Sequence, residues 1–596
     1  LLSNPAVDPN CQDSEYNRTP FYIACRQGYL DIVELLLKDK RVDVNKANKD
    51  GGTPFFNSCF NGQIEVVKLL LNDKRVDINK TTTSEATSFF IACQEGKIEV
   101  VKLLLKDGRA NVNKALSDGC TPFYFSCQEG QIEIVKLLLN DEKVEVNKST
   151  NNGKTPFYVA CQEQHLEVVK LLLANERIII NKADSGGRTP FHIACQNGTI
   201  EIVELLLKNQ RLDVNKQLND GATPFVLAYE NGQIEVLKLL LNDKRVDVNK
   251  ADTYGATTFY VTCENDQIEV VKLLLKNERV EVNKAKNDGA TPLFIACQVG
   301  QAEIVKLLIN NERIDANQAM NGGSIPFYIA CQRGHMDIVK LLLDNERVDV
   351  NKPNNKFGST TFFFACQDAQ LEVVKLLVKN KRVEVNKALN DGATPFFMAC
   401  QNGHTEIVKE LLNEKRVDIN KSLNAGSIPF WIACADGHID IVKLLLNDER
   451  VDVNKPNNKF GSTTFYIACV NNQVDIVKLL IDYERIDINK AKNDGATPLF
   501  YACQEGLIEI VKLLLSTDRI DVNKSMNGTT PFYIACQNGQ IEVVEYIFAS
   551  ESEMDFKKKW KNIDLALDIS KRRSSSVQKY DWETIEGYQK VKRNCP

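Results

Sequence analysis

The 596-residue chain has only five histidines, and it lacks the short motifs of most catalytic chemistry. There is no glycine-rich loop of the kind that cradles phosphate, no Ser-His-Asp set and no Cys-x-x-Cys pair. We therefore expect no catalytic residue, no metal site and no cofactor, and we expect that this chain is not an enzyme. Four of the histidines lie near predicted turns between helices, and we interpret them as turn residues: His165, His335, His404 and His438.

Long apolar runs and strong charge are also missing. No stretch of 18 apolar residues exists, so we expect no membrane span. The net charge of −5 at pH 7 argues against nucleic acid as a primary partner. Leu1-Leu2 opens the sequence where a signal peptide would have a charged segment before an apolar one, so we expect no signal peptide.

What the chain does have is one segment that recurs along most of its length. Thr189-Pro190-Phe191-His192-Ile193-Ala194-Cys195 begins a copy, and Gly198 follows three residues later. The Thr can cap a helix, the Pro suits its first position, and the Gly suits the left-handed turn that ends it. Residues 200–207 then place apolar side chains on one face at a 3.6-residue period, which predicts a second, antiparallel helix. Neither helix can bury its apolar face alone, so the copies must stack.

This segment resembles the ankyrin repeat, which reads Thr-Pro-Leu-His-x-Ala-Ala at the same place. Here Phe usually replaces the Leu, Cys replaces the second Ala, and the His is kept only at His192. Segments such as Lys40-Arg41-Val42 are one residue longer than in the family, and they give a period of 34 instead of 33. The resemblance implies an all-α solenoid of stacked helix-turn-helix units with short hairpin connections.

Sixteen repeats follow one another without linkers, at a spacing of 34 residues except for two steps of 35 and one of 33. We expect residues 1–18 to be the end of a truncated preceding repeat and residues 19–549 to be sixteen ankyrin repeats. We expect residues 550–596 to form a basic tail with a degenerate capping repeat that is itself truncated. The repeats begin at Thr19, Thr53, Thr87, Thr121, Thr155, Thr189, Thr223, Thr257, Thr291, Ile325, Thr360, Thr394, Ile428, Thr463, Thr497 and Thr530.

Fifteen of the 18 cysteines occupy one position of the repeat. Equivalent positions on stacked helices lie about 8–10 Å apart, whereas a disulfide needs Cα atoms within about 7 Å. We therefore expect no disulfide, and a shared zinc ion fails on the same geometry. We interpret these thiols as small core residues in a reducing compartment, with redox sensing as the alternative. They are Cys25, Cys59, Cys93, Cys127, Cys161, Cys195, Cys263, Cys297, Cys331, Cys366, Cys400, Cys434, Cys469, Cys503 and Cys536.

Some repeats lack the residues that favour the first helix and its turn. A residue other than Gly in a left-handed turn costs about 1 kcal/mol. This cost is least for Asn or Asp, and the repeat at Thr360 combines the loss of Pro at Thr361 with Ala369 in the turn. We therefore expect this repeat to open first, because stability in repeat arrays is nearly a sum of neighbour terms. Ser88, Thr258, Thr361 and Thr464 replace the Pro, and Gln164, Asp266, Ala369 and Asn472 replace the Gly.

Two rows of side chains are candidates to face a partner. One is an aromatic ladder that includes Tyr22, Phe56, Phe90, Tyr124 and Tyr158, for which packing between neighbouring first helices is the alternative. The other is a row of glutamines that the ankyrin resemblance places near the concave side, for which a solvated surface is the alternative. The glutamines are Gln94, Gln128, Gln162, Gln196, Gln298, Gln332, Gln367, Gln401, Gln504 and Gln537.

The strongest binding candidates lie in a segment that occurs twice. Residues 353–359 and 456–462 are identical and lie 103 residues, or three repeats, apart. The ankyrin resemblance places them at hairpin tips on one edge of the solenoid. An aromatic beside Lys is typical of an interface anchor, and its repetition permits bivalent contact. The alternative is that each Phe folds back onto its own hairpin. The candidates are Lys356, Phe357, Lys459 and Phe460.

We interpret the chain as an intracellular protein-protein interaction scaffold or adaptor, monomeric and cytoplasmic, with the nucleus as an alternative location. Its partners would be other proteins, bound through the concave and hairpin surfaces. Ser575, which follows Arg572-Arg573-Ser574, is a candidate phosphorylation site. Two alternatives stay open: the chain is the targeting or regulatory part of a larger enzyme, a kinase or ubiquitin-transfer protein whose catalytic domain lies outside it, or it is a passive spacer.

Overall fold

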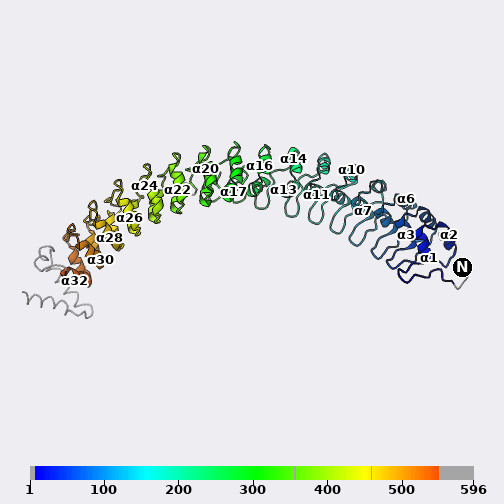
Figure 1. Ribbon diagram of the computed structural model, residues 1–596, viewed down its shortest axis with the longest axis horizontal. Helices are drawn as coiled ribbons and strands as arrows, with labels where there is room; N and C mark the ends of the chain where they lie inside the picture. The colour runs from blue at the N-terminus through cyan, green and yellow to red at the C-terminus, as the bar shows by residue number, and fades with distance from the viewer. Residues whose placement is uncertain (1–6, 355–356, 458, 550–596) are drawn as a thin grey trace, which may run out of the picture. The chain divides into compact units, whose positions relative to one another are not determined.

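The computed structural model describes residues 7–354, 357–457 and 459–549 (Figure 1). Within these ranges the chain forms 32 α-helices, two for each predicted repeat, and no strand beyond two isolated bridges. The predicted all-α solenoid of helix pairs is confirmed. The contacts divide the chain into two compact units, Leu1–Asn287 and Asp288–Pro596, called the N-terminal and C-terminal units below. The division of the sequence at residues 18 and 549 stays a prediction.

The N-terminal unit contains the first sixteen helices. They are α1 (Pro20–Gln27), α2 (Leu30–Lys38), α3 (Pro54–Asn61), α4 (Ile64–Asn72), α5 (Ser88–Gln94), α6 (Ile98–Asp107), α7 (Pro122–Gln128), α8 (Ile132–Leu139), α9 (Pro156–Gln162), α10 (Leu166–Ala174), α11 (Pro190–Asn197), α12 (Ile200–Leu207), α13 (Pro224–Glu230), α14 (Ile234–Asn242), α15 (Thr258–Glu264) and α16 (Ile268–Leu275).

The C-terminal unit contains the other sixteen. They are α17 (Pro292–Val299), α18 (Ala302–Ile309), α19 (Pro326–Arg333), α20 (Met336–Asp344), α21 (Thr361–Gln367), α22 (Leu371–Lys379), α23 (Pro395–Gln401), α24 (Thr405–Leu412), α25 (Pro429–Ala435), α26 (Ile439–Leu446), α27 (Thr464–Val470), α28 (Val474–Ile481), α29 (Pro498–Glu505), α30 (Ile508–Leu515), α31 (Pro531–Asn538) and α32 (Ile541–Ala549).

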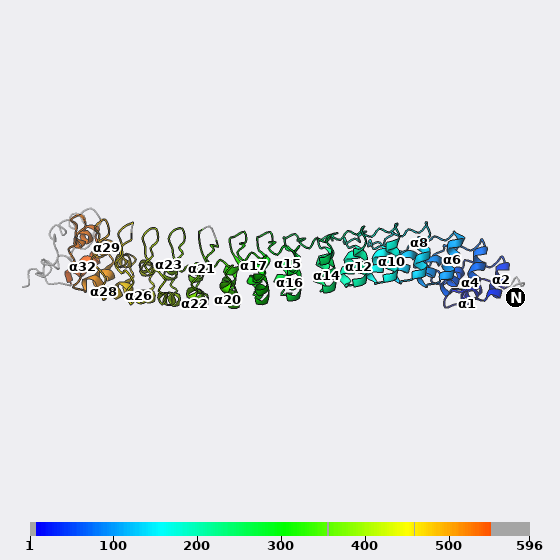
Figure 2. The ribbon, with the colours of Figure 1, turned by 90° about the horizontal axis from the view of Figure 1, so that it is seen from above.

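In each unit the helices form two rows. Each odd-numbered first helix contacts the second helix that follows it, and most first helices and most second helices contact their neighbours in the same row. Figure 2 shows the hairpin connections between consecutive pairs along one side of the rows. The first helices therefore lie next to the hairpins, and the second helices form the other layer.

The first helices begin and end as the repeated segment predicts. Thr53, for example, accepts a hydrogen bond from the backbone N of Phe56 at 3.0 Å, and Pro54 occupies the first helical position. The turn glycines have positive φ, as at Gly198 with φ 74°. The four residues predicted to replace turn glycines also have positive φ: 63° at Gln164, 56° at Asp266, 60° at Ala369 and 54° at Asn472.

The residues that replace the first-position Pro carry an additional cost. The hydroxyl oxygens of Ser88, Thr258, Thr361 and Thr464 are all buried, and none has a hydrogen-bond partner. A buried polar group left unpaired costs about 1–3 kcal/mol. The repeat that begins at Thr360 therefore combines an unpaired hydroxyl with the left-handed Ala369.

The repeat-position cysteines form part of a continuous core with the Phe residues of the first helices. Cys25, Cys195 and Cys434 are completely buried, as are Phe21 and Phe191. Burial raises the pKa of the Cys25 thiol far above its usual range, and the same holds for Cys195. Because only the thiolate is readily oxidised, these residues serve packing rather than redox sensing. All cysteines in the described ranges are free thiols, in line with the predicted absence of disulfides.

An asparagine in most hairpins joins one repeat to the next. Nδ2 of Asn45 donates to the Arg75 carbonyl at 2.7 Å, and Oδ1 of Asn45 accepts from the backbone N of Asp77 at 2.8 Å. One carboxamide thus pairs with two main-chain groups of the following hairpin. The same two bonds occur at Asn79, Asn113, Asn147, Asn181, Asn215, Asn249, Asn317, Asn351, Asn386, Asn420, Asn454 and Asn489.

An arginine in the same hairpins bonds in the opposite direction, to the preceding repeat. Arg279 donates to the carbonyl of Leu241, in the last turn of α14, at 2.7 Å, and to that of Val246 at 2.8 Å. Arg450 reaches Leu412, the last residue of α24, at 2.6 Å. The final carbonyls of a helix have no partner within the helix and carry partial negative charge, so a guanidinium satisfies both needs.

His192 lies inside the core of the N-terminal unit. Its Nδ1 accepts a hydrogen bond from the backbone N of Thr189 at 3.1 Å. Burial lowers the pKa of His192 to about 4, and the nearby carbonyls of Lys216 and Ala222 oppose this shift. The folded repeat therefore holds a neutral imidazole at pH 7.

We predict that the repeat at Thr360 opens before its neighbours. Cys366 of α21 should react with iodoacetamide faster than Cys331 or Cys400, all three being buried in the folded chain. Ala369→Gly should slow labelling of Cys366 about three- to fivefold, because glycine removes the left-handed strain. Ala365→Gly, inside the same helix, should accelerate it. Mass spectrometry of a labelling time course measures all three rates, and equal rates in the wild type would contradict the prediction.

We also predict a pH dependence that comes from His192. Because its folded pKa is below the unfolded value of about 6.5, the unfolded chain binds the proton first, and stability falls as pH drops from about 6.5 toward 4, by about 3 kcal/mol at most. His192→Tyr, which copies Tyr158 of the preceding repeat, should reduce this loss. Unfolding by guanidinium at pH 7 and pH 4.5 measures the loss in the free energy of unfolding between the two pH values, with His165→Gln as the control. If the His192→Tyr protein loses as much stability between pH 7 and pH 4.5 as the wild type does, His192 is not the source of the pH dependence.

Candidate functional site

Most of the hairpin tips are joined to the next hairpin by a main-chain hydrogen bond. In the C-terminal unit, the carbonyl of Phe357 accepts from the backbone N of Asn390 at 3.2 Å. The carbonyl of Phe460 accepts from the backbone N of Asn493 at 2.9 Å. The main chain of the tip is therefore fixed by the neighbouring hairpin, whatever side chain the tip carries.

The side chains of the two predicted Phe residues are exposed. Phe357 exposes 56% of its surface and Phe460 exposes 54%, so neither is buried in its own hairpin. The structure brings Lys459 and Phe460 together, with the ammonium nitrogen 4.9 Å from the ring centroid. A cation at this distance from an aromatic face is attracted to it. Lys356 and Ser575 lie outside the described residues.

Two aromatic tips in the N-terminal unit were not among the predicted sites. Tyr254 exposes 71% of its surface, and its carbonyl accepts from the backbone N of Asn287 at 3.0 Å. Tyr16 exposes 42%, and the Arg18 guanidinium lies 4.4 Å from its ring. Both stand three residues before the Thr that caps the next helix, as Phe357 and Phe460 do. That register is the signal that identifies them, whereas the duplicated segment does not include them.

The aromatic ladder is mainly a packing feature. Tyr22, Phe90 and Tyr158 are buried. Across neighbouring first helices, Phe90 meets Phe125 with 5.1 Å between ring centroids. The structure thus favours the packing interpretation of the ladder over the partner-binding one.

Within the C-terminal unit, one part of the first-helix face is hollowed into a groove of about 360 Å³. We call it the tryptophan groove. Residues of α21, α23 and α25 line it together with the hairpins that precede α23 and α25. Its apolar lining includes Phe363, Phe397, Met398, Leu423 and Ile432, and its polar lining includes Gln367, Asp391, Gln401, Ser427 and Trp431.

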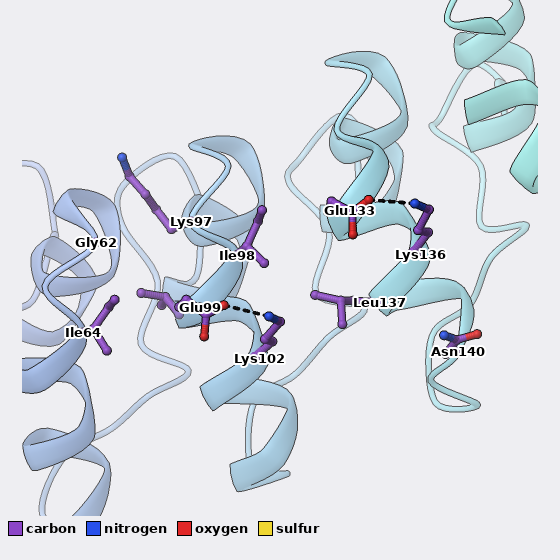
Figure 3. Close-up of a pocket in the computed structure, with 11 residues that line it drawn as sticks. Gly62, Ile64, Lys97, Ile98, Glu99, Lys102, Glu133, Lys136, Leu137 and Asn140 are labelled. Carbon is purple, nitrogen blue, oxygen red and sulfur yellow. Dashed lines mark hydrogen bonds and ion pairs between the residues drawn. The ribbon is translucent and has the colours of Figure 1, made fainter. Parts of the chain in front are cut away.

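A second hollow, of about 480 Å³, lies on the second-helix face of the N-terminal unit, between α4, α6 and α8 (Figure 3). Ile64, Ile98 and Leu137 supply its apolar surface. Four of its charged groups pair within their own helices, since Lys102 contacts Glu99 at 2.7 Å and Lys136 contacts Glu133 at 2.7 Å. Pairs of this kind, three residues apart on an exposed helix face, each contribute a few tenths of a kcal/mol.

The predicted turn histidines occupy the residue before the second helices. His165 Nε2 lies 2.8 Å from the Gln128 carbonyl oxygen, and His404 Nε2 lies 2.8 Å from that of Gln367. His335 and His438 make the equivalent contacts at 3.2 and 2.8 Å. Each histidine therefore bonds to the end of the first helix of the preceding repeat.

Metal-binding side-chain groups and membrane-spanning helices are both absent from the described ranges. No group of three or more His, Cys, Asp or Glu side chains there could hold a metal ion. None of the helices in the described part of the chain has the length and apolar character that crossing a membrane requires.

Comparison with known proteins gives a consistent result along the chain. No curated protein matches it. A family model described as ankyrin repeats, in three copies, matches overlapping stretches over nearly the full length. The matched residues are 1–82, 89–184, 141–217, 176–252, 206–286, 226–320, 259–354, 327–425, 362–457, 430–526 and 485–559.

We predict that the exposed Phe tips contribute little to stability. Phe357→Ala combined with Phe460→Ala should leave the melting temperature nearly unchanged, because exposed side chains lose little contact on truncation. Phe362→Ala, which truncates a buried ring of α21, should cost about 3–5 kcal/mol and serves as the contrast. Thermal unfolding followed by circular dichroism compares them. If the melting temperature of the double variant falls as much as that of Phe362→Ala, the Phe tips serve the stability of the fold.

Proposed function

Because the chain belongs to the ankyrin repeat family, whose repeats generally act as protein-protein interaction modules, we propose that it is a scaffold or adaptor that binds partner proteins. Binding would use the hairpin tips and the first-helix surface, with no bond-forming or bond-breaking chemistry. The proposal includes a cytoplasmic or nuclear location and a monomeric state. The buried free thiols support a reducing compartment.

The observation that carries this proposal is the pair of exposed aromatic tips. Among the hairpins of the C-terminal unit, the equivalent position holds Asp391 or Asp494 in the repeats that follow each Phe. Such polar residues are ordinary in turns, whereas an exposed Phe beside Lys offers apolar area and a charge at one point. The next hairpin holds the main chain of the tip in place. The exposed ring therefore stays at a fixed position that a partner can reach.

The two anchors are also spaced regularly. Phe357 and Phe460 stand three repeats apart in the same unit, and stacked helices are about 8–10 Å apart, so the tips are separated by roughly 24–30 Å. A partner with two equivalent apolar pockets at this spacing would bind the second tip without a second loss of translational freedom. We propose a dimeric or tandem-domain partner for this reason.

Site-specific crosslinking tests the proposal. The photoreactive residue p-benzoylphenylalanine, placed at Phe357 or Phe460 of the full chain in living cells, should yield the same discrete partner adducts at both positions. Asp288 and Asp494, which stand at the same position three residues before a capping Thr in the C-terminal unit, provide controls and should yield fewer adducts. Mass spectrometry identifies the partner. Equal adduct patterns at all four positions, or none at the Phe positions, would refute tip-mediated binding.

A further inference from the structure

We propose that the tryptophan groove binds an extended peptide segment that carries one large apolar side chain beside a basic residue. The proposal rests on the proposed scaffold function and specifies the partner chemistry of one surface. It concerns side chains other than Phe357 and Phe460, so the two can be tested separately.

The floor of the groove fits a single apolar side chain. Phe363 and Phe397 are packed and almost completely buried, and Leu389, Met398 and Ile432 surround them while staying partly exposed. The volume of about 360 Å³ is near the lower end of the range for ligand sites, about 300–1,000 Å³. It has room for one side chain and a short length of main chain, but not for a folded domain.

The groove also contains a hydrogen-bond donor without an acceptor. Nε1 of Trp431 is buried, and it has no hydrogen-bond partner. The indole N–H can only donate, so it needs an oxygen from outside the groove. Phe397 and Tyr466 hold the equivalent positions in the neighbouring repeats, so packing alone does not require an indole here. A peptide carbonyl would supply the missing acceptor.

Two glutamines suit a peptide main chain. The Gln367 and Gln401 carboxamides line the groove one repeat apart, and within the described residues neither makes a side-chain hydrogen bond. In contrast, Oε1 of Gln162 accepts from Lys154 at 3.0 Å, and Gln504 donates to Glu505 at 2.8 Å. A carboxamide can donate to a peptide carbonyl and accept from a peptide N–H. One repeat spans about 8–10 Å, or about three residues of extended chain at 3.3 Å each, so one strand reaches both glutamines.

The charge of the groove selects the residue beside the apolar one. Asp391 is the only charged residue that lines it, and no Lys or Arg does. Oδ1 of Asp391 accepts from the backbone N of Ala393 at 3.0 Å, and the side chain is exposed at the rim. A Lys or Arg in the peptide is therefore attracted to this carboxylate, and an acidic residue is repelled.

Fluorescence of Trp431 can report on binding directly. Trp560→Phe and Trp582→Phe leave Trp431 as the only tryptophan of the full chain. The probes are three synthetic decapeptide libraries with a fixed central Leu-Lys, Leu-Glu or Ala-Lys pair and mixed uncharged flanks. The best Leu-Lys peptide should shift Trp431 emission and bind at least tenfold tighter than its Leu-Glu and Ala-Lys counterparts.

Variants then locate the site. Trp431→Phe removes the N–H but keeps an aromatic ring, and Met398→Trp fills the groove. Each should lower the affinity of the best peptide, measured by calorimetry, at least fivefold while the circular dichroism spectrum stays unchanged. Phe357→Ala with Phe460→Ala should not affect it.

Several outcomes would overturn the proposal. Equal binding to the groove variants, equal binding of the Leu-Glu peptide, or no bound peptide at all would exclude the groove as a basic-apolar peptide site. Self-association of the chain that Trp431→Phe abolishes would instead assign the groove to a second copy. Tip crosslinking is measured independently, so a failure of peptide binding at the groove leaves the scaffold proposal standing. If both peptide binding and tip crosslinking fail, both proposals are refuted.

Discussion

Hydrogen bonds between successive repeats are the constraint on which the other features of each unit depend. A helix pair of this size leaves unpaired carbonyls at the ends of both helices and unpaired main-chain groups in its hairpin. Arg279 and its equivalents bond to the end of the preceding second helix, while Asn45 and its equivalents bond to the following hairpin. Each repeat therefore completes the main-chain bonding of both neighbours, in addition to sharing a hydrophobic core with them.

Because these bonds involve main-chain groups, they leave some side-chain positions free to vary. The tip carbonyl bonds to the next hairpin at Phe460 as it does at Asp391, although the hairpin that carries Phe460 is one residue longer. The same reasoning applies to the first-helix face, where Trp431 occupies a position held by Phe397 and Tyr466 in adjacent repeats. The groove is thus a local change of side chain, and the Phe tips are a local change of side chain and hairpin length, on a backbone that the neighbouring repeats hold in place.

The sequence predicted the features that depend on residues close together in the chain. The capping Thr53, the left-handed Ala369 and the buried Cys195 all follow from local rules about helix ends, turns and periodicity. The partners of Arg279 were not predicted, since a guanidinium on a hairpin has several possible acceptors until the distance between repeats is known. The exposure of Phe357 stayed open for the same reason. The unpaired Trp431 N–H could not be predicted, because it depends on three successive repeats placing no hydrogen-bond acceptor beside the indole.

The direction of the asparagine and arginine bonds has a consequence for how such a chain changes length. Most repeats offer an arginine to the repeat before and an asparagine carboxamide to the repeat after, so a whole repeat, or a block of three, can be inserted or deleted by recombination and the new junction finds the same bonding partners. A partial repeat would break them on both sides. The two identical hairpins around Phe357 and Phe460, 103 residues apart, are what a copied block of three leaves behind, and an anchor gained once is then duplicated at a fixed spacing without any further mutation.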